Sequence, residues 1–147
     1  MSWVYLDKQL TEDDIPATAI GFVYAITCTA NSMKYIGKKL LTKAAYKTVN
    51  GKKKKCRKTS DWENYFSSCT ELKDDVIKFG KDKFHREIIC FCLSQATLTY
   101  SEEKCQYLTE CLERADYYNG NIGCRKYKRN IFQKADTSNL SNWLRKK

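Results

Sequence analysis

Residues 21–37 read GFVYAITCTANSMKYIG, two strand-like runs separated by a short segment of small and polar residues. The first run, residues 21–28, is rich in β-branched and aromatic side chains, which favour strands. Residues 29–32 have the length and composition of a hairpin loop, and a second short run covers residues 33–37. The sequence therefore predicts a β-hairpin that opens the folded domain at Gly21.

A helix and a third strand are predicted further along the chain. Ser68 and Glu71 have the spacing of a capping box, and apolar residues then recur at helical intervals as far as Gly80, which suits a helix end. Residues 84–93 form a nearly continuous apolar run of strand length. We expect this run to be a central strand buried on both faces.

Thr99 and Glu102 form a second capping box, and we expect their helix to run to about Arg114. At about 100° per residue, Glu102 borders the sheet whereas Glu103 faces water. This orientation follows from the expected buried stripe of the helix, which consists of Cys105, Leu108, Leu112 and Ala115.

The remaining segments are less regular. Residues 40–46 suit a short helix, and residues 47–60 a cationic loop that turns at Asn50-Gly51 and is mobile until an anion neutralises it. We expect residues 1–20 to be an irregular N-terminal arm, 21–124 the domain, and 125–147 a basic tail with a short helix near 140–144. The predicted fold is α+β, with a small central mixed or antiparallel sheet flanked by helices.

The charge balance points to a polyanionic partner. The 147 residues contain 27 Lys and Arg against 17 Asp and Glu, a formal net charge of +10. Nucleic acid is the leading candidate. No stretch resembles a signal peptide, a membrane span or a lipid anchor, so we expect no membrane partner and a place in the cytoplasm, where thiols stay reduced.

The eight cysteines do not predict a zinc site or a disulfide framework. Only Cys90 and Cys92 lie within four residues of one another, whereas zinc ribbons and fingers need two such pairs. We interpret the cysteines as small apolar core residues.

Two motifs then identify a family. The run Gly21-Phe22-Val23-Tyr24 and the run Tyr35-Ile36-Gly37, with tyrosines eleven positions apart, resemble the two halves of the GIY-YIG nuclease signature. The order of elements from residue 21 to about 120 is similar to that family, and especially to its small phage-type members. The resemblance implies an endonuclease that hydrolyses phosphodiester bonds in DNA with a divalent metal, Mg²⁺ or Mn²⁺.

The resemblance also implies roles for particular residues. Glu102 holds the metal, Tyr24 orients or deprotonates the attacking water, and Tyr35 is its partner. Asn119 supports the glutamate, and Gly37 belongs to the motif. Because a free phenol has a pKa of about 10, we expect nearby cations or metal to lower the tyrosine pKa values.

The chain departs from the family pattern in its cations. Lys43 and Lys47 stand near the positions where many members carry an arginine and a histidine. Lys39 is our candidate to neutralise the scissile phosphate, with Arg57 as a possible substitute, although a lysine lacks the arginine fork. The lone His85 is interpreted as structural.

The basic residues near the hairpin are expected to contact the DNA backbone without reading its sequence. They are Lys38, Lys43, Lys47, Lys52, Lys53, Lys54, Lys55, Arg57 and Lys58. The alternative is a nucleic-acid-binding protein that keeps the nuclease fold without turnover. The sequence leaves open the target site, nicking versus double-strand cleavage, the oligomeric state and the biological role.

Overall fold

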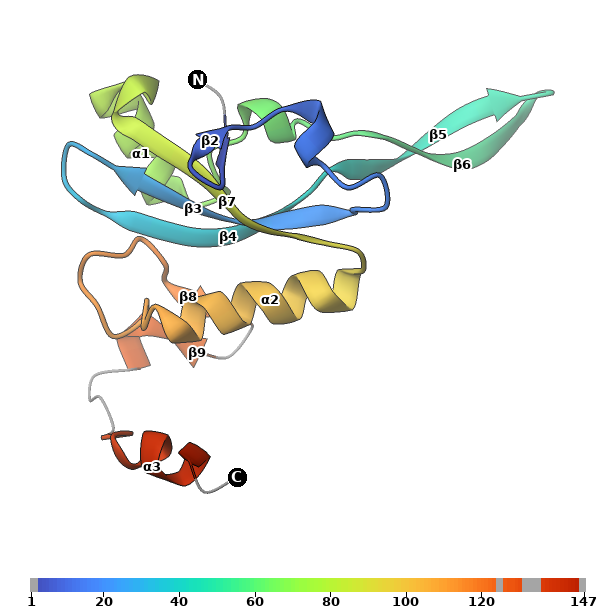
Figure 1. Ribbon diagram of the computed structural model, residues 1–147. Coiled ribbons are helices and arrows are strands. Elements are labelled where there is room, and N and C mark those ends of the chain that lie inside the picture. Colours follow the sequence, from blue (N-terminus) through green and yellow to red (C-terminus); the bar gives the residue numbers. More distant parts are fainter. Residues whose placement is uncertain (1–2, 124–125, 131–135, 146–147) are drawn as a thin grey trace.

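The computed structural model describes residues 3–123, 126–130 and 136–145. Its centre is a mixed five-stranded sheet with the strand order β2-β1-β7-β3-β4, and helices α1 and α2 lie on its two sides (Figure 1). The α+β fold with a small central sheet is therefore confirmed.

The expected hairpin is present and forms one side of this sheet. Strand β3, Gly21–Cys28, pairs antiparallel with β4, Lys34–Leu40, and the register sets Tyr24 opposite Gly37. Strand β7, Phe84–Cys92, pairs antiparallel with the other side of β3. Its central place is as expected, but Ile89 is 41% exposed, so the strand is not buried along both faces. Strand β4 is left as one edge of the sheet.

The N-terminal segment is not the irregular arm that the sequence suggested. Strand β1, Val4–Tyr5, pairs parallel with β7, and β2, Lys8–Gln9, extends the sheet beyond it. A short 3-10 helix, η1, Glu12–Asp14, follows. Trp3 is 2% exposed and packs edge-on against two rings of β3. Burial of this single large ring ties a polar segment to the domain.

The segment between β4 and α1 contains the largest departure from expectation. Instead of a short helix and a loop, residues 42–59 form a two-stranded antiparallel ribbon of β5, Thr42–Val49, and β6, Lys52–Thr59. The turn expected at Asn50-Gly51 is present, with φ of 52° and 76°, as a tight hairpin turn requires. Alternating lysines fit a solvent-exposed strand as well as a loop, so composition alone misled the assignment.

The two main helices occur where expected, but neither uses the predicted capping box. Helix α1, Thr70–Phe79, begins after Cys69 and ends at Gly80, whose φ is 91°. Helix α2 spans Gln95–Leu108, and Ser94 is its N-cap, whose hydroxyl accepts a hydrogen bond from the Thr97 amide. It thus starts earlier and ends earlier than predicted.

The buried face of α2 differs from the face that we predicted. Leu98 and Gln106 are buried, whereas Leu108, which we expected to face inward, is 73% exposed. Cys105 and Leu112 of the predicted stripe do belong to the core beneath α2, so the prediction was wrong only at Leu108 and Ala115, which are exposed.

Each face of the sheet has its own core. One core joins Phe22, Tyr24 and Ile26 of β3 to Leu72 of α1, and the other joins Val23 of β3 to Leu98 of α2. The short helix η2, Trp62–Asn64, and the helix η3, Lys81–Lys83, flank α1 in sequence.

The cysteines of the described residues are free thiols, and Cys28, Cys92 and Cys111 are buried. Cys90 and Cys92 both belong to the core beneath α2. Their placement agrees with the interpretation of cysteine as a small apolar core residue.

The C-terminal part forms a small separate hairpin. Strand β8, Asn121–Ile122, pairs with β9, Lys126–Tyr127, which is followed by the short helix η4, Lys128–Asn130. This pairing joins the expected domain to the expected tail; residue 124, where we divided them, lies outside the described residues. Helix α3, Asn139–Arg145, occupies the place of the predicted short helix. Within the described residues, no helix is both long and apolar enough to cross a membrane.

Candidate active site

Gly37 lies at the centre of the candidate site because it leaves room for two tyrosine rings. A Cβ atom built on Gly37 would lie 2.6 Å from the Tyr24 hydroxyl and 2.7 Å from Cε1 of Tyr35. The two ring centroids are 6.2 Å apart with the planes tilted by 33°. The two halves of the sequence motif thus bring two phenols together on one face of the sheet.

Tyr24 is the more deeply placed of the two phenols. It is 1% exposed, and the ring of Tyr65 packs edge-on against it at 6.0 Å. Burial raises the pKa of Tyr24 well above 10, and the neighbouring phenols raise it further, whereas a hydrogen bond with Ser67 lowers it. The expectation that the protein itself lowers this pKa was wrong, since loss of hydration outweighs the field of the surrounding cations.

Tyr35 lies at the boundary between the core and the surface. Burial raises its pKa from 10, while hydrogen bonds with the Ser67 and Ser68 hydroxyls lower it. The charge of Glu102 also raises the pKa of Tyr35. The carboxylate of α2 is therefore within electrostatic reach of the phenol, although its helix packs on the other face of the sheet.

The edge position of β4 explains how groups from both faces meet. No further strand of the described chain runs alongside most of β4, so side chains from α2 reach Ile36 and Lys38 of this strand from its open side. Gln106, one turn after Glu102, donates a hydrogen bond to the Ile36 carbonyl at 3.1 Å and lies 3.5 Å from Glu102 Oε1. This contact fixes the helix against the edge strand.

Glu102 is largely buried and holds one cation. Its side chain is 17% exposed, and the Lys38 Nζ lies 3.5 Å from Oε2 and donates to the Thr99 hydroxyl at 2.9 Å. Burial raises the pKa of Glu102 and the Lys38 charge lowers it, with a net upward shift. Glu102 lies inside α2 and does not cap it, so its carboxylate is not engaged with the helix terminus.

Asn119 supports the edge strand from its open side. It is 2% exposed, its Oδ1 accepts a hydrogen bond from the Ile36 amide at 3.0 Å, and its Nδ2 donates to the Ile36 carbonyl at 2.8 Å. Asn119 therefore binds the strand that Gln106 also binds. Its link to Glu102 is indirect and runs through the Ile36 backbone and Gln106.

Lys39 lies on the tyrosine face of β4. Its Nζ is 2.6 Å from Oδ1 of Asp61 and 4.0 Å from the centre of the Tyr65 ring. The hydrogen bond from Lys39 lowers the pKa of Asp61, which is 73% exposed in its side chain. The Lys39 side chain is only 18% exposed, so the pair joins a largely buried ammonium group to a solvent-facing carboxylate.

The segment after η2 supplies groups that the sequence did not reveal. Tyr65 contacts both Tyr24 and Lys39, and Ser67 adopts a φ of 94°, which is unusual for a residue with a Cβ. The buried Arg86 holds this segment by donating to the carbonyls of Glu63 and Tyr65 at 3.0 and 2.9 Å. The sequence signal that could have pointed to these residues is the adjacent stretch of residues 60–62, which is similar to small phage-type members of the GIY-YIG family.

Other predicted residues lie outside this cluster. Arg57 is bonded to Thr42 at the base of the ribbon through two contacts of 2.8 Å, and His85 is exposed on β7. The remaining predicted DNA contacts lie on the ribbon: Lys43, Lys47, Lys52, Lys53, Lys54, Lys55 and Lys58. They are exposed at the surface.

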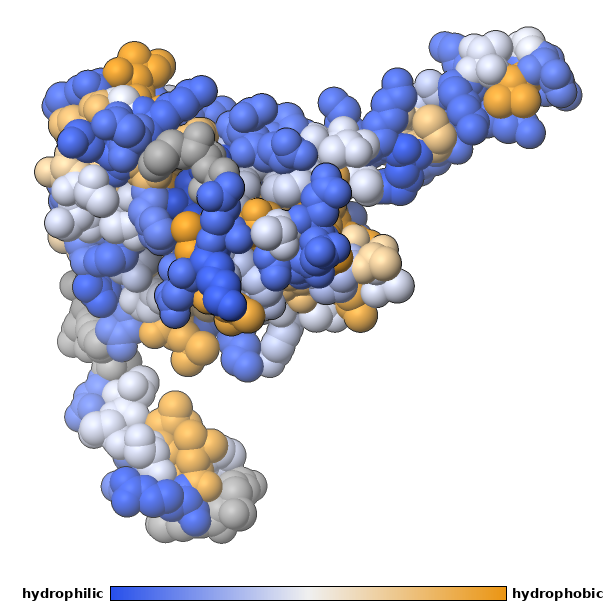
Figure 2. Space-filling model, turned by 45° about the horizontal axis from the view of Figure 1, so that its top comes forward, coloured by the Kyte–Doolittle hydropathy of each residue, from blue (hydrophilic) through white to orange (hydrophobic). Residues whose placement is uncertain are grey.

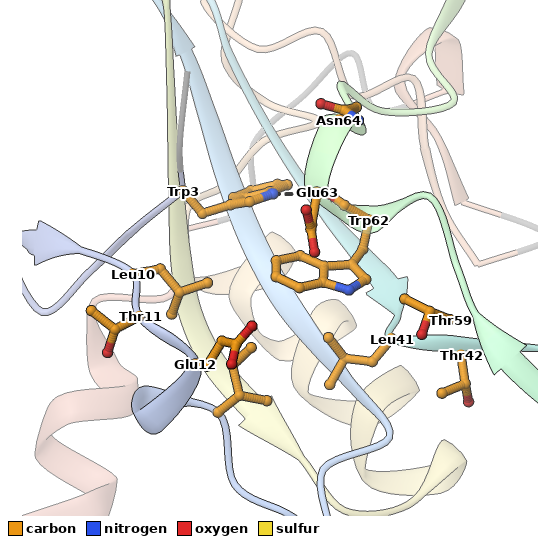
Figure 3. Close-up of a pocket in the computed structure, with 11 residues that line it drawn as sticks. Trp3, Leu10, Thr11, Glu12, Leu41, Thr42, Thr59, Trp62, Glu63 and Asn64 are labelled. Atoms are coloured by element: carbon orange, nitrogen blue, oxygen red, sulfur yellow. Dashed lines mark hydrogen bonds between the residues drawn. The ribbon is translucent and has the colours of Figure 1, made fainter.

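A cleft of about 650 Å³ lies beside the candidate site, between the N-terminal segment and the base of the ribbon (Figure 3). Its walls include the rings of Trp3 and Trp62, and Trp3 donates a hydrogen bond to the Trp62 carbonyl at 2.9 Å. None of the predicted catalytic residues lines this cleft.

The donor set around Glu102 fits a hard divalent cation. Within the described residues, no three His, Cys, Asp or Glu side chains gather as a closed metal cage. Mg²⁺ does not require such a cage, because it commonly binds one or two carboxylates and takes its other ligands from water and substrate phosphate. A single, mostly buried carboxylate with a lysine beside it is compatible with that description.

A mixed sheet with paired motif tyrosines and a helix-borne glutamate defines a nuclease-like domain. The match with the family described as "Putative endonuclease segE, GIY-YIG domain" covers residues 3–122, so this chain belongs to that GIY-YIG endonuclease family. The match begins at residue 3, which agrees with the burial of Trp3 in the domain. No curated protein and no solved structure matches the chain significantly.

Proposed function

We propose that the protein is a metal-dependent endonuclease that hydrolyses phosphodiester bonds in DNA. The observation that carries this proposal is the packing of the Tyr24 and Tyr35 rings against Gly37, with the Glu102 carboxylate of α2 close enough for its charge to act on Tyr35. Membership of the GIY-YIG family supports the activity class. We place the reaction in the cytoplasm, where the free thiols stay reduced.

Glu102 is the residue that would hold Mg²⁺ or Mn²⁺. A bound metal supplies stabilisation of the charge that gathers on the phosphate oxygens and on the departing alkoxide. Lys38 neutralises Glu102 in the protein alone, so the site is already built to keep one positive charge beside this carboxylate. Gln106 and Asn119 hold the strand that faces it.

The two tyrosines act on the water. Because burial keeps both phenols neutral near pH 7, they orient the nucleophile through hydrogen bonds before any proton transfer. Tyr35 is the better placed to contact water, since Tyr24 is 1% exposed and supports Tyr35 from below. Lys39 offsets the phosphate charge when it leaves Asp61.

One observation favours a second function, a nucleic-acid-binding protein without turnover. Both phenols have raised pKa values, and Lys39 is paired with Asp61, so in the protein alone neither an activated base nor a free phosphate-binding cation is present among these residues. Substrate and metal must rearrange the site if it is catalytic.

Cleavage of supercoiled plasmid tests the two proposals. The parent with Mg²⁺ or Mn²⁺ should produce nicked or linear DNA, and Glu102→Gln and Tyr35→Phe should each reduce the rate by at least about a hundredfold. Tyr24→Phe should reduce it as well. Glu113→Gln, an exposed glutamate outside the site, serves as the matched control. A parent that binds the plasmid but leaves it intact with both metals supports the binding protein.

A further inference from the structure

The ribbon formed by β5 and β6 is an unusual concentration of positive charge. Residues 42–59 contain seven lysines and one arginine, and no carboxylate. The ribbon projects away from the sheet, and its two strands pair only with each other (Figure 1). Figure 2 shows it as a mostly hydrophilic arm.

The register distributes the cations over both faces of the ribbon. Directly opposed residues of antiparallel strands share a face. Lys43 lies opposite Lys58 and Lys47 opposite Lys54, and Lys52, opposite Val49, shares their face, which we call the five-lysine face. The opposite face, which we call the Arg57 face, carries Lys53, Lys55 and Arg57.

This arrangement opposes the stability of the ribbon itself. Like charges directly opposite each other destabilise a strand pair, and a lone two-stranded hairpin is only marginally stable in water. The side chains of Lys43, Lys47, Lys54 and Lys58 are exposed and find no nearby carboxylate on the ribbon. A partner with negative charge along both sides of the ribbon offsets the repulsion on both faces.

We propose that this ribbon inserts into the major groove of duplex DNA, with each face directed toward one of the two phosphate backbones. The inference rests on DNA as the substrate. With its faces directed at the backbones, the ribbon spans the groove by its thickness, about 10 Å including side chains, which fits a groove about 12 Å wide but not the minor groove of about 6 Å. A ribbon that lay on a single backbone would use the cations of one face only.

The base of the ribbon links it firmly to the candidate active site. β5 follows β4 with only Leu41 between them, and Leu41 is 8% exposed. Ser60 closes the base through its amide to the Leu41 carbonyl at 2.9 Å and its hydroxyl to the Leu40 carbonyl at 2.6 Å. The groove contact therefore directs which phosphate reaches Tyr35 and Glu102.

Salt-dependent binding of a short duplex in EDTA tests whether both faces contribute. Three double variants of the full chain carry the comparison: Lys47→Gln with Lys54→Gln, Lys53→Gln with Lys55→Gln, and the control Lys78→Gln with Lys81→Gln outside the ribbon. The slope of log K against log salt is negative, and each phosphate contact adds about 0.9 to its magnitude. Each ribbon pair should therefore lower this magnitude by about 1.8, and the control pair by much less. A change on one face only, or ribbon effects equal to the control, overturns the proposal.

Methylation of the same duplex by dimethyl sulfate identifies the groove. Guanine N7 lies in the major groove and adenine N3 in the minor groove. The parent at saturation should protect N7, and both ribbon variants should lose that protection. Protection of adenine N3 with N7 left reactive overturns major-groove insertion.

The two proposals fail in different ways. If the parent neither binds nor cuts DNA, the proposed function is wrong and the ribbon has another partner. If the parent cuts plasmid while guanine N7 stays fully reactive, the nuclease stands and only the groove assignment is wrong.

Discussion

At the scale of single residues, the candidate site depends on a missing side chain. Gly37 has no Cβ, and this absence gives the Tyr24 hydroxyl its place above the edge strand. The need for glycine here is one of space, since the φ of Gly37 is not among the positive values. A family motif is thus explained by a steric requirement.

We predict that Gly37→Ala lowers both stability and cleavage. The added methyl group would lie 2.6 Å from the oxygen of a ring that is 1% exposed and cannot move into solvent. Overpacking of this kind costs about 1–3 kcal/mol of unfolding free energy, and displaced tyrosines should slow cleavage at least tenfold. Urea denaturation and plasmid cleavage measure the two effects.

Gly120→Ala is the matched control, because a Cβ at Gly120 meets no atom within 4 Å. Equal losses in the two variants would show that close approach to Tyr24 is not the reason for glycine at position 37.

The pKa of Glu102 gives a second prediction at this scale. Burial raises the pKa of Glu102 above its usual 4.5 in the folded protein, and the positive charge of Lys38 offsets only part of this upward shift. Between 4.5 and the raised value the folded state binds more protons than the unfolded state, so this residue makes stability fall as pH rises through that interval. Glu102→Gln should therefore be more stable than the parent near pH 7 and equal to it at pH values well below 4.5.

Urea denaturation across the acid range measures this difference, with Glu113→Gln as an exposed control. A Glu102→Gln variant that is less stable at pH 7 would mean that the ion pair with Lys38 outweighs the cost of burying the carboxylate.

At the scale of elements, the two-residue strand β1 has an effect out of proportion to its length. β1 has two residues, yet Trp3 beside it packs against Phe22 and Tyr24 and under the Arg86 guanidinium at 4.6 Å. The N-terminal segment therefore supports the face of β3 that carries Tyr24.

We predict that Trp3→Ala lowers the free energy of unfolding by about 3–5 kcal/mol, the usual cost of removing a buried tryptophan. Thermal or urea denaturation measures this loss. Leu6→Ala, at a position 71% exposed in the same segment, should change stability by no more than about 0.5 kcal/mol. A Trp3→Ala variant as stable as Leu6→Ala would restore the picture of a loosely attached arm.

At the scale of the whole molecule, the proposed DNA-binding ribbon and the candidate active site occupy different parts of the fold. The ribbon of β5 and β6 projects from the body of the domain (Figure 1), whereas Tyr24 belongs to β3, Tyr35 to the edge strand β4 and Glu102 to α2. With a net charge of +10, attraction to DNA does not require the metal.

We predict that EDTA abolishes cleavage but changes the DNA dissociation constant by no more than about threefold at matched ionic strength, since lysine–phosphate contacts supply the affinity. Electrophoretic mobility shift and plasmid cleavage, run in parallel, measure the two properties. Glu102→Gln with Mg²⁺ should behave as the parent does in EDTA. A tenfold or larger loss of affinity on metal removal would place the metal among the main contacts to DNA.

The sequence by itself predicted the hairpin of β3 and β4, the central strand β7, the helices α1 and α2, and the family. These elements can be predicted from local sequence, because strand alternation, turn residues and helical spacing are properties of neighbouring residues. The pairing of Tyr24 with Gly37 follows from the same hairpin. The polyanionic partner followed from charge alone.

Only the tertiary structure decided what depends on distant contacts. Trp3 is buried because β7 offers a free edge, and α2 packs on the sheet through Leu98 and Gln106 and not through Leu108. Residues 42–59 pair with each other rather than forming a helix and a loop, a choice that composition cannot settle for a lysine-rich run. The raised pKa values of the tyrosines arise from burial, which no local pattern records.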